Sequence, residues 1–244
     1  MKKLEIYRND NFILNDAFDQ IVMNIHILKK QHGYRSFVLC GCEAGDGTTT
    51  VSINLSAALA SAGYKTVLID GDIRKDNRYK RLNENAGTGL SDYLLGRCEL
   101  KNVIYETTTD KLFYIPCGEL IDNPVRLLCS ERMEEARKDL LETYDYIIYD
   151  MPAVNVAMDA KVLAVNTDAV ILVSSIGKTG KNGLIDAANA LTEINANLIG
   201  TIVNRTDMDQ YVSYNKDYDY FQNERYIKKT GKSKKKIKLA RKDK

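Results

Sequence analysis

CGCEAGDGTTTVSINLS, residues 40–56, joins the end of an apolar segment to a helix-like one through a glycine-rich turn. Gly45 and Gly47 allow the backbone to turn its N–H groups inward around an anion, and a helix beginning near Thr49 adds its dipole. The spacing approximates the phosphate-loop pattern GxxxxGK(S/T), in which Thr49 holds the place of the hydroxyl that binds magnesium. Thr48 stands where that pattern has a lysine. The stretch predicts a phosphate site without its usual positive charge.

Taken alone, this turn is a weak match to the pattern. Cys42 also replaces the first glycine of the motif. A glycine-rich connection between a strand and a helix is as often purely structural as it is a phosphate site. The prediction therefore depends on what the rest of the chain places beside the turn.

Two further apolar segments end in carboxylates. The segment TVLIDGDIRK contains Asp70, Asp72 and Arg74 at its end, and YDYIIYDMPA contains Asp150. A single aspartate at a strand end is most often a turn former or a helix cap. Two acidic endings and one glycine-rich ending, each on its own apolar strand, instead predict a nucleotide pocket. In such a pocket carboxylates hold Mg²⁺ and backbone N–H groups hold phosphates.

Apolar runs alternate along the chain with segments of helical period. This alternation predicts an α/β fold with a doubly wound, mostly parallel sheet, whose ligands bind beyond the carboxyl ends of the strands. The predicted strands are 36–40, 66–69, 112–115, 146–149, 169–173 and 198–203. The predicted helices are 16–30, 49–62, 123–143, 159–165 and 181–195.

Composition divides the 244 residues into three parts. Residues 1–205 are expected to form one domain, 206–227 a tyrosine-rich segment, and 228–244 a basic disordered tail with ten Lys or Arg and one Asp. The five cysteines suit neither a zinc site nor a disulfide framework, which favours a reducing cytosol. No segment is apolar enough for a signal peptide or a membrane span.

The motifs GDGTTT, LIDGDIRK and IIYDMPA resemble the modified Walker A, Walker A′ and Walker B motifs of bacterial tyrosine kinases. These kinases act in capsule and exopolysaccharide operons and are P-loop NTPases of the deviant-Walker ATPase type. The similarity extends to GLSDYLLG, residues 89–96, and CGELIDNPVRLLCS, residues 117–130. The resemblance implies an ATP- and Mg²⁺-dependent protein-tyrosine autokinase.

The resemblance also implies roles for single residues. Thr49 and Asp70 would contact magnesium or nucleotide, Asp150 would serve as the Walker B acid of the metal site, and Asp72 would accept or orient the tyrosine hydroxyl. Asp70, Asp72 and Asp150 thus form the implied catalytic group. The implied nucleotide-binding residues are Gly45, Asp46, Gly47, Thr48, Thr49, Thr50 and Arg74. The implied phosphoacceptors are Tyr211, Tyr214, Tyr218, Tyr220 and Tyr226.

The sequence departs from the family pattern at two functional places. Thr48 removes a charge-assisted contact worth about 1.5–3 kcal/mol, which Arg74, Lys75 or an arginine of another subunit would have to replace. The N-terminal ExxRxxR signature of ring assembly reads Asp16, Asp19 and Val22, so ring formation of the family type is not expected.

Three functions remain open on the sequence alone. The first is an active tyrosine autokinase, and the second is a nucleotide-binding regulatory partner that is inactive because of Thr48. The third is an ATPase that switches conformation to position cargo. The family implies a membrane polysaccharide co-polymerase, or chain-length adaptor, as partner at the cytoplasmic face of the plasma membrane. The basic tail suits anionic lipid, whereas no aromatic stacking motif points to nucleic acid.

Overall fold

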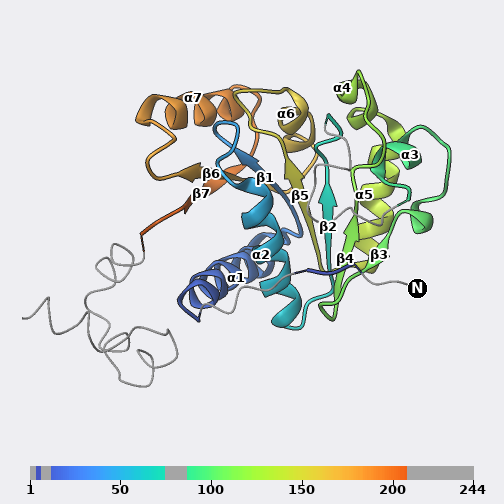
Figure 1. Cartoon of the computed structure of the whole chain (residues 1–244), viewed down its shortest axis with the longest axis horizontal. Coiled ribbons are helices and arrows are strands. Elements are labelled where there is room, and N and C mark those ends of the chain that lie inside the picture. The colour runs from blue at the N-terminus through green and yellow to red at the C-terminus, as the bar shows by residue number, and fades with distance from the viewer. Residues whose placement is uncertain (1–3, 7–11, 75–86, 208–244) are drawn as a thin grey trace, which may run out of the picture.

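The computed structural model describes residues 4–6, 12–74 and 87–207. They contain a seven-stranded sheet in the order β3-β4-β2-β5-β1-β6-β7 (Figure 1). All neighbouring strands run parallel except β3 and β4, which are antiparallel. The predicted doubly wound, mostly parallel α/β fold is confirmed. The strands are β1 (Ser36–Gly41), β2 (Thr66–Asp70), β3 (Tyr105–Glu106), β4 (Leu112–Ile115), β5 (Tyr146–Met151), β6 (Ala169–Ser175) and β7 (Leu198–Asn204).

Helices cover both faces of the sheet (Figure 1). On one face, α1 (Phe12–His32) and α2 (Thr48–Ser61) bury their apolar sides against Phe37, Leu39 and Leu68. The other face is covered by the remaining helices, which share an apolar cluster with the opposite side chains of the same strands. These helices are α3 (Leu90–Leu94), α4 (Pro124–Leu128), α5 (Glu131–Thr143), α6 (Asp159–Ala164) and α7 (Lys181–Thr192).

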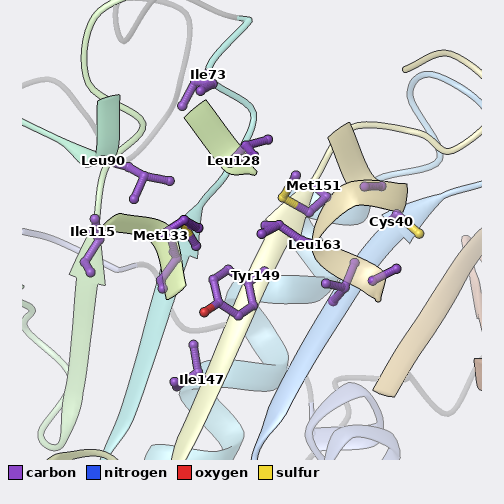
Figure 2. Packing of buried hydrophobic residues seen from close by; sticks show 14 of the residues in the cluster. Cys40, Ile73, Leu90, Ile115, Leu128, Met133, Ile147, Tyr149, Met151 and Leu163 are labelled. Atoms are coloured by element: carbon purple, nitrogen blue, oxygen red, sulfur yellow. The ribbon is translucent and has the colours of Figure 1, made fainter. Parts of the chain in front are cut away.

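Successive side chains of β5 point to opposite faces of the sheet. Ile147, Tyr149 and Met151 lie in the cluster beneath α5 and α6, as Figure 2 shows. Ile148 lies in the opposite cluster, beneath α1 and α2. Because successive strand residues point to opposite faces, Asp150 projects toward α2. The fold therefore directs this carboxylate to the side on which the glycine-rich loop enters its helix.

The structure differs from the predicted elements in several places. The predicted helix 123–143 is two helices, because Ser130 adopts an extended backbone (φ −72°, ψ 155°) and caps α5. The short helix α3 and the two-residue strand β3 were not predicted, since neither is long enough to establish a period. The first helix begins at Phe12 rather than at Asp16. None of these differences moves a strand end that carries the predicted site.

Candidate phosphate-binding site

A glycine-rich loop, residues 41–47, connects β1 to α2 beyond the carboxyl end of the sheet. Gly45 and Gly47 adopt φ values of 83° and 87°, which other L-residues rarely reach. At Gly41, an added Cβ would lie 2.9 Å from Thr48 Oγ1 and 3.0 Å from the Glu43 carbonyl oxygen. The loop is therefore wound tightly enough that its backbone can approach a ligand closely.

The first turn of α2 presents backbone donors to this loop. The N–H groups of Thr48, Thr49 and Thr50 have no acceptor in the part of the chain that the structure describes, whereas Val51 N–H donates to the Gly47 carbonyl at 3.0 Å. Unpaired donors at a helix N-terminus, reinforced by the helix dipole, favour an anion. These three amides lie where the sequence predicted nucleotide contacts.

Cys42 takes the place of the first glycine in the motif without adding charge. Its side chain is fully buried at the start of the loop. Burial, followed by the nearby carboxylates of Asp46 and Glu43, raises the pKa of the thiol to about 11. The thiol therefore stays neutral at physiological pH and does not oppose a bound phosphate.

Asp46 holds the loop in shape from within. Its carboxylate is fully buried and accepts hydrogen bonds from Glu43 N–H at 2.8 Å and from Thr179 Oγ1 at 2.7 Å. Its carbonyl accepts from Ser175 Oγ at 2.9 Å and from Asn204 Nδ2 at 2.8 Å. Asp46 therefore positions the loop, since its side chain faces the loop and the β6–α7 turn, and its nucleotide role stays a prediction.

Replacing Asp46 with asparagine is expected to destabilise the fold by about 1.5–3 kcal/mol, because asparagine keeps one acceptor oxygen, so that one of the buried bonds to Glu43 and Thr179 is lost and the other is no longer charge-assisted. Urea denaturation followed by circular dichroism measures this change. The matched control is Asp186→Asn on the exposed side of α7, which should alter the unfolding free energy by less than about 0.5 kcal/mol. Equal stability of the two variants would contradict the positioning role.

The acidic strand ends meet on the α2 side of the sheet. Asp70 of β2 pairs in register with Asp150 of β5, and both are almost fully buried. Ser52 of α2 donates from Oγ to Asp150 Oδ1 at 3.2 Å. The backbone N–H of Asp72 donates to Asp70 Oδ1 at 3.2 Å, so this second carboxylate follows directly on the first. Asp70 and Asp150 are therefore neighbours across the sheet, and the backbone of Asp72 contacts Asp70.

Tyr114 of β4 supports Asp70 from the neighbouring strand. Its hydroxyl donates to Asp70 Oδ2 at 3.3 Å. Burial, followed by the charge of Asp70, raises the pKa of Tyr114 well above its ordinary value. The phenol therefore keeps its proton and acts as a fixed donor that orients the carboxylate.

Arg74 makes a contact that the sequence did not predict. Its guanidinium donates to both carboxylate oxygens of Asp159, at 2.6 and 2.9 Å, and Asp159 is fully buried at the start of α6. This hydrogen bonding raises the pKa of Arg74 above its ordinary value. Arg74 is thus committed to α6, while Lys75, the other candidate within this chain, lies outside the described residues.

The carboxylates and the loop fit Mg²⁺ bound together with a nucleotide. Among residues 4–6, 12–74 and 87–207, no group of three or more His, Cys, Asp or Glu forms a complete metal cage. Mg²⁺ is commonly held by one or two carboxylates, water and substrate phosphates rather than by such a cage. Asp70, Asp150 and the first-turn amides of α2 would supply the protein's share of that arrangement.

Some residues at this site were missed by the sequence reasoning. Ser52 lies one helical turn beyond Thr49, a spacing that could have indicated a second hydroxyl on the same face. Thr179 and Lys178 follow the apolar strand β6, which ends in polar residues as β2 and β5 do. The phosphoacceptors predicted at Tyr211, Tyr214, Tyr218, Tyr220 and Tyr226 lie outside the described residues.

Comparison with known proteins gives consistent matches over most of the chain. A family model described as an AAA domain matches residues 38–220. Tyrosine-protein kinase CpsD of Streptococcus pneumoniae serotype 4 is 33% identical over 165 residues, which cover 67% of this chain and 73% of that protein. The crystal structure of the chimerical protein CapA2B2 aligns with a TM-score of 0.75 and 27% identity, covering 83% of this chain and 93% of that one.

A more distant structure shares the fold alone. The septum site-determining protein MinD from Pyrococcus horikoshii, complexed with Mg-ADP, aligns with a TM-score of 0.54 and 23% identity. The alignment covers 73% of this chain and 76% of the other. The sheet described above is thus an architecture on which Mg-ADP is bound in another protein.

Proposed function

This chain belongs to the family of bacterial tyrosine-protein kinases, and we propose that it is an ATP- and Mg²⁺-dependent protein-tyrosine kinase that phosphorylates its own C-terminal tyrosines. The observation that carries the proposal is the meeting of the glycine-rich loop with Asp70 and Asp150 at one edge of the sheet. Donors for phosphate and ligands for a hard cation stand there side by side. The biological setting that we propose is the control of capsular or exopolysaccharide synthesis and export.

Each part of the site has a distinct task in this reaction. The amides of Thr48, Thr49 and Thr50 would bind the phosphates of ATP, and Thr49, Asp70 and Asp150 would hold the metal. Bound Mg²⁺ would neutralise charge on the phosphates during transfer. Asp72 accepts the proton of the acceptor tyrosine, whose oxygen bonds to the γ-phosphorus as the bond to the ADP oxygen breaks.

The alternative of an inactive nucleotide-binding regulator rests on Thr48. The comparisons do not favour it, because the curated relative that supports the family is named a tyrosine-protein kinase. A conformational-switch ATPase has only architecture in its favour, through the likeness to MinD at 23% identity. The kinase remains the better supported function.

The proposed partner is the cytoplasmic segment of a membrane polysaccharide co-polymerase. None of the helices in the described ranges is long and apolar enough to cross a bilayer. The location that we propose from the family resemblance is peripheral, at the inner face of the plasma membrane, with contact to anionic lipid through the basic residues 228–244. Val22, which replaces an arginine of the family's ring signature, is buried under α2, so any self-association would use another surface.

The test is phosphotyrosine formation by the purified full chain. The chain is incubated with Mg²⁺ and γ-labelled ATP, alone and with the cytoplasmic segment of the co-polymerase from the same organism. We expect label on tyrosine, and loss of label both in Asp72→Asn and in a chain with all five predicted acceptors changed to phenylalanine. Absence of phosphotyrosine under both conditions would overturn the kinase proposal, whatever the chain binds.

A further inference from the structure

The glycine-rich loop lies between acidic and basic side chains. On the β5 and β2 side stand Asp150 and Asp70. On the other side β6 pairs directly with β1, and the turn that follows β6 carries Lys178, whose Nζ donates to the Ala44 carbonyl. The carboxylates are thus placed for the metal, and a cation approaches the loop from the opposite direction.

Lys178 lies directly over the loop backbone. A Cβ added to Gly45 would collide with Lys178 Nζ, so the ammonium group occupies the space that only a glycine leaves open. Gly45 is two residues before Gly47, within the part of the loop whose amides surround phosphate in the GxxxxGK(S/T) pattern. The ammonium group of Lys178 is therefore close to the part of the loop that lacks the positive charge of the usual lysine, which Thr48 replaces.

The turn that carries Lys178 is fixed to the loop on both sides of this residue. Ser175 Oγ donates to the Asp46 carbonyl at 2.9 Å, and Thr179 Oγ1 donates to the Asp46 carboxylate at 2.7 Å. Thr179 Oγ1 also accepts from Ser175 N–H at 3.1 Å, which closes the turn. The backbone of Lys178 is therefore held in position, and only its side chain has to move to reach a ligand.

Other nearby cations are less suited to this task. Arg74 is tied to the buried Asp159. Arg205 donates from Nη2 to the Gly45 carbonyl at 3.1 Å and so braces the outer side of the loop. Lys178 is exposed and forms no ion pair with a carboxylate of the described residues. Its single bond to a neutral carbonyl can be exchanged for a stronger charge-assisted bond to phosphate.

We propose that Lys178 supplies, from the β6–α7 turn, the phosphate-binding positive charge that Thr48 does not provide. This inference rests on the proposed nucleotide site and names a further substrate-contacting residue of it. Lys178 is expected to contact the β- or γ-phosphate of ATP, the groups that the lysine of the common pattern reaches. The loss of the usual lysine is then compensated from a strand that is distant in sequence but adjacent to β1.

The experiment measures the affinity of the full chain for Mg-ATP, Mg-ADP and AMP by isothermal titration calorimetry. Lys178→Ala and Lys178→Gln are expected to weaken Mg-ATP binding about ten-fold or more, with little change for AMP. Lys178→Arg should retain most of the affinity. The matched control is Lys181→Ala, because Lys181 is an exposed lysine of the same surface that makes no hydrogen bond or ion pair with the loop among the described residues.

A double variant and an unfolding measurement distinguish the loss of a positive charge from damage to the fold. Thr48→Lys combined with Lys178→Ala should restore Mg-ATP affinity, because the charge returns at the usual place in the motif. Thermal unfolding without nucleotide checks that the Lys178 variants keep the loop intact. If Lys178→Gln binds like the natural chain, Lys178 only braces the Ala44 carbonyl and the inference fails.

Three further results would also overturn the inference: equal weakening by Lys181→Ala, no restoration by the double variant, or no measurable Mg-ATP binding by the natural chain. The kinase proposal can fail separately. A chain that forms no phosphotyrosine but binds Mg-ATP in a Lys178-dependent way would refute the proposed reaction and leave the role of Lys178 standing.

Discussion

Replacing Asp70 with asparagine is expected to slow tyrosine phosphorylation about a hundred-fold or more. The carboxylate lies beside Asp150 in a nearly water-free part of the site, where a charge acts strongly on the metal and on the transferring phosphate. Asparagine has the same size but binds Mg²⁺ weakly. The rate is measured as label transferred to tyrosine over a range of Mg²⁺ concentrations, and the variant should require more Mg²⁺ for half-maximal rate.

Tyr114→Phe provides the matched control for this substitution. It removes the hydroxyl that donates to Asp70 at 3.3 Å but leaves the carboxylate in place. The bond is charge-assisted but long, so its loss should cost about 1.5 kcal/mol at most and slow the rate about twelve-fold or less. A rate for Asp70→Asn equal to that of the natural chain at every Mg²⁺ concentration would remove Asp70 from the metal site.

Replacing Thr48 with lysine is expected to raise Mg-ATP affinity about ten-fold and to speed phosphorylation. A charge-assisted contact to phosphate contributes about 1.5–3 kcal/mol, and the lower end applies when Lys178 already supplies part of the charge. Thr48 begins α2, with its hydroxyl near Gly41, so a longer side chain at this position starts at the base of the loop. Calorimetric titration measures the affinity, and label transfer measures the rate.

A neutral side chain of similar length at position 48 tests whether the positive charge causes the expected gain in Mg-ATP affinity. Thr48→Met should leave the affinity for Mg-ATP unchanged or lower it. The gain from Thr48→Lys should also be larger in a Lys178→Ala chain than in the natural one, because the two lysines then no longer act on the same phosphates. Equal affinity in Thr48→Lys and Thr48→Met would show that the loop does not use a cation at this position.

The sequence predicted the acidic half of the site for a clear physical reason. Asp70 and Asp150 end apolar strands, and the carboxyl ends of parallel strands lie at one edge of a sheet whatever the order of the strands. No knowledge of distant contacts was needed. The same rule located the loop after β1, whereas the match of the predicted strand 112–115 with β4 follows from its short apolar run.

The positions of the basic side chains near the loop could not be predicted in this way. They depend on the order of the strands in the sheet, and the pattern of apolar residues does not reveal that order. Lys178 reaches the loop across 134 residues because β6 lies next to β1. Arg74 was expected at the nucleotide, yet the path of α6 brings Asp159 within 2.6 Å of its guanidinium. Both outcomes are tertiary effects, in which a neighbour from a distant segment decides the contact of a long, flexible side chain.

The hydrogen bond from Arg205 to the Gly45 carbonyl has a consequence for the segment that follows it. The chain leaves its last strand at the rim of the loop, so the segment that follows starts beside the proposed phosphate site. Tyr211 is six residues beyond Arg205, and a chain of that length spans at most about 20 Å. By covalent length alone, the first tyrosine of this segment cannot move farther than that from its anchor at the loop.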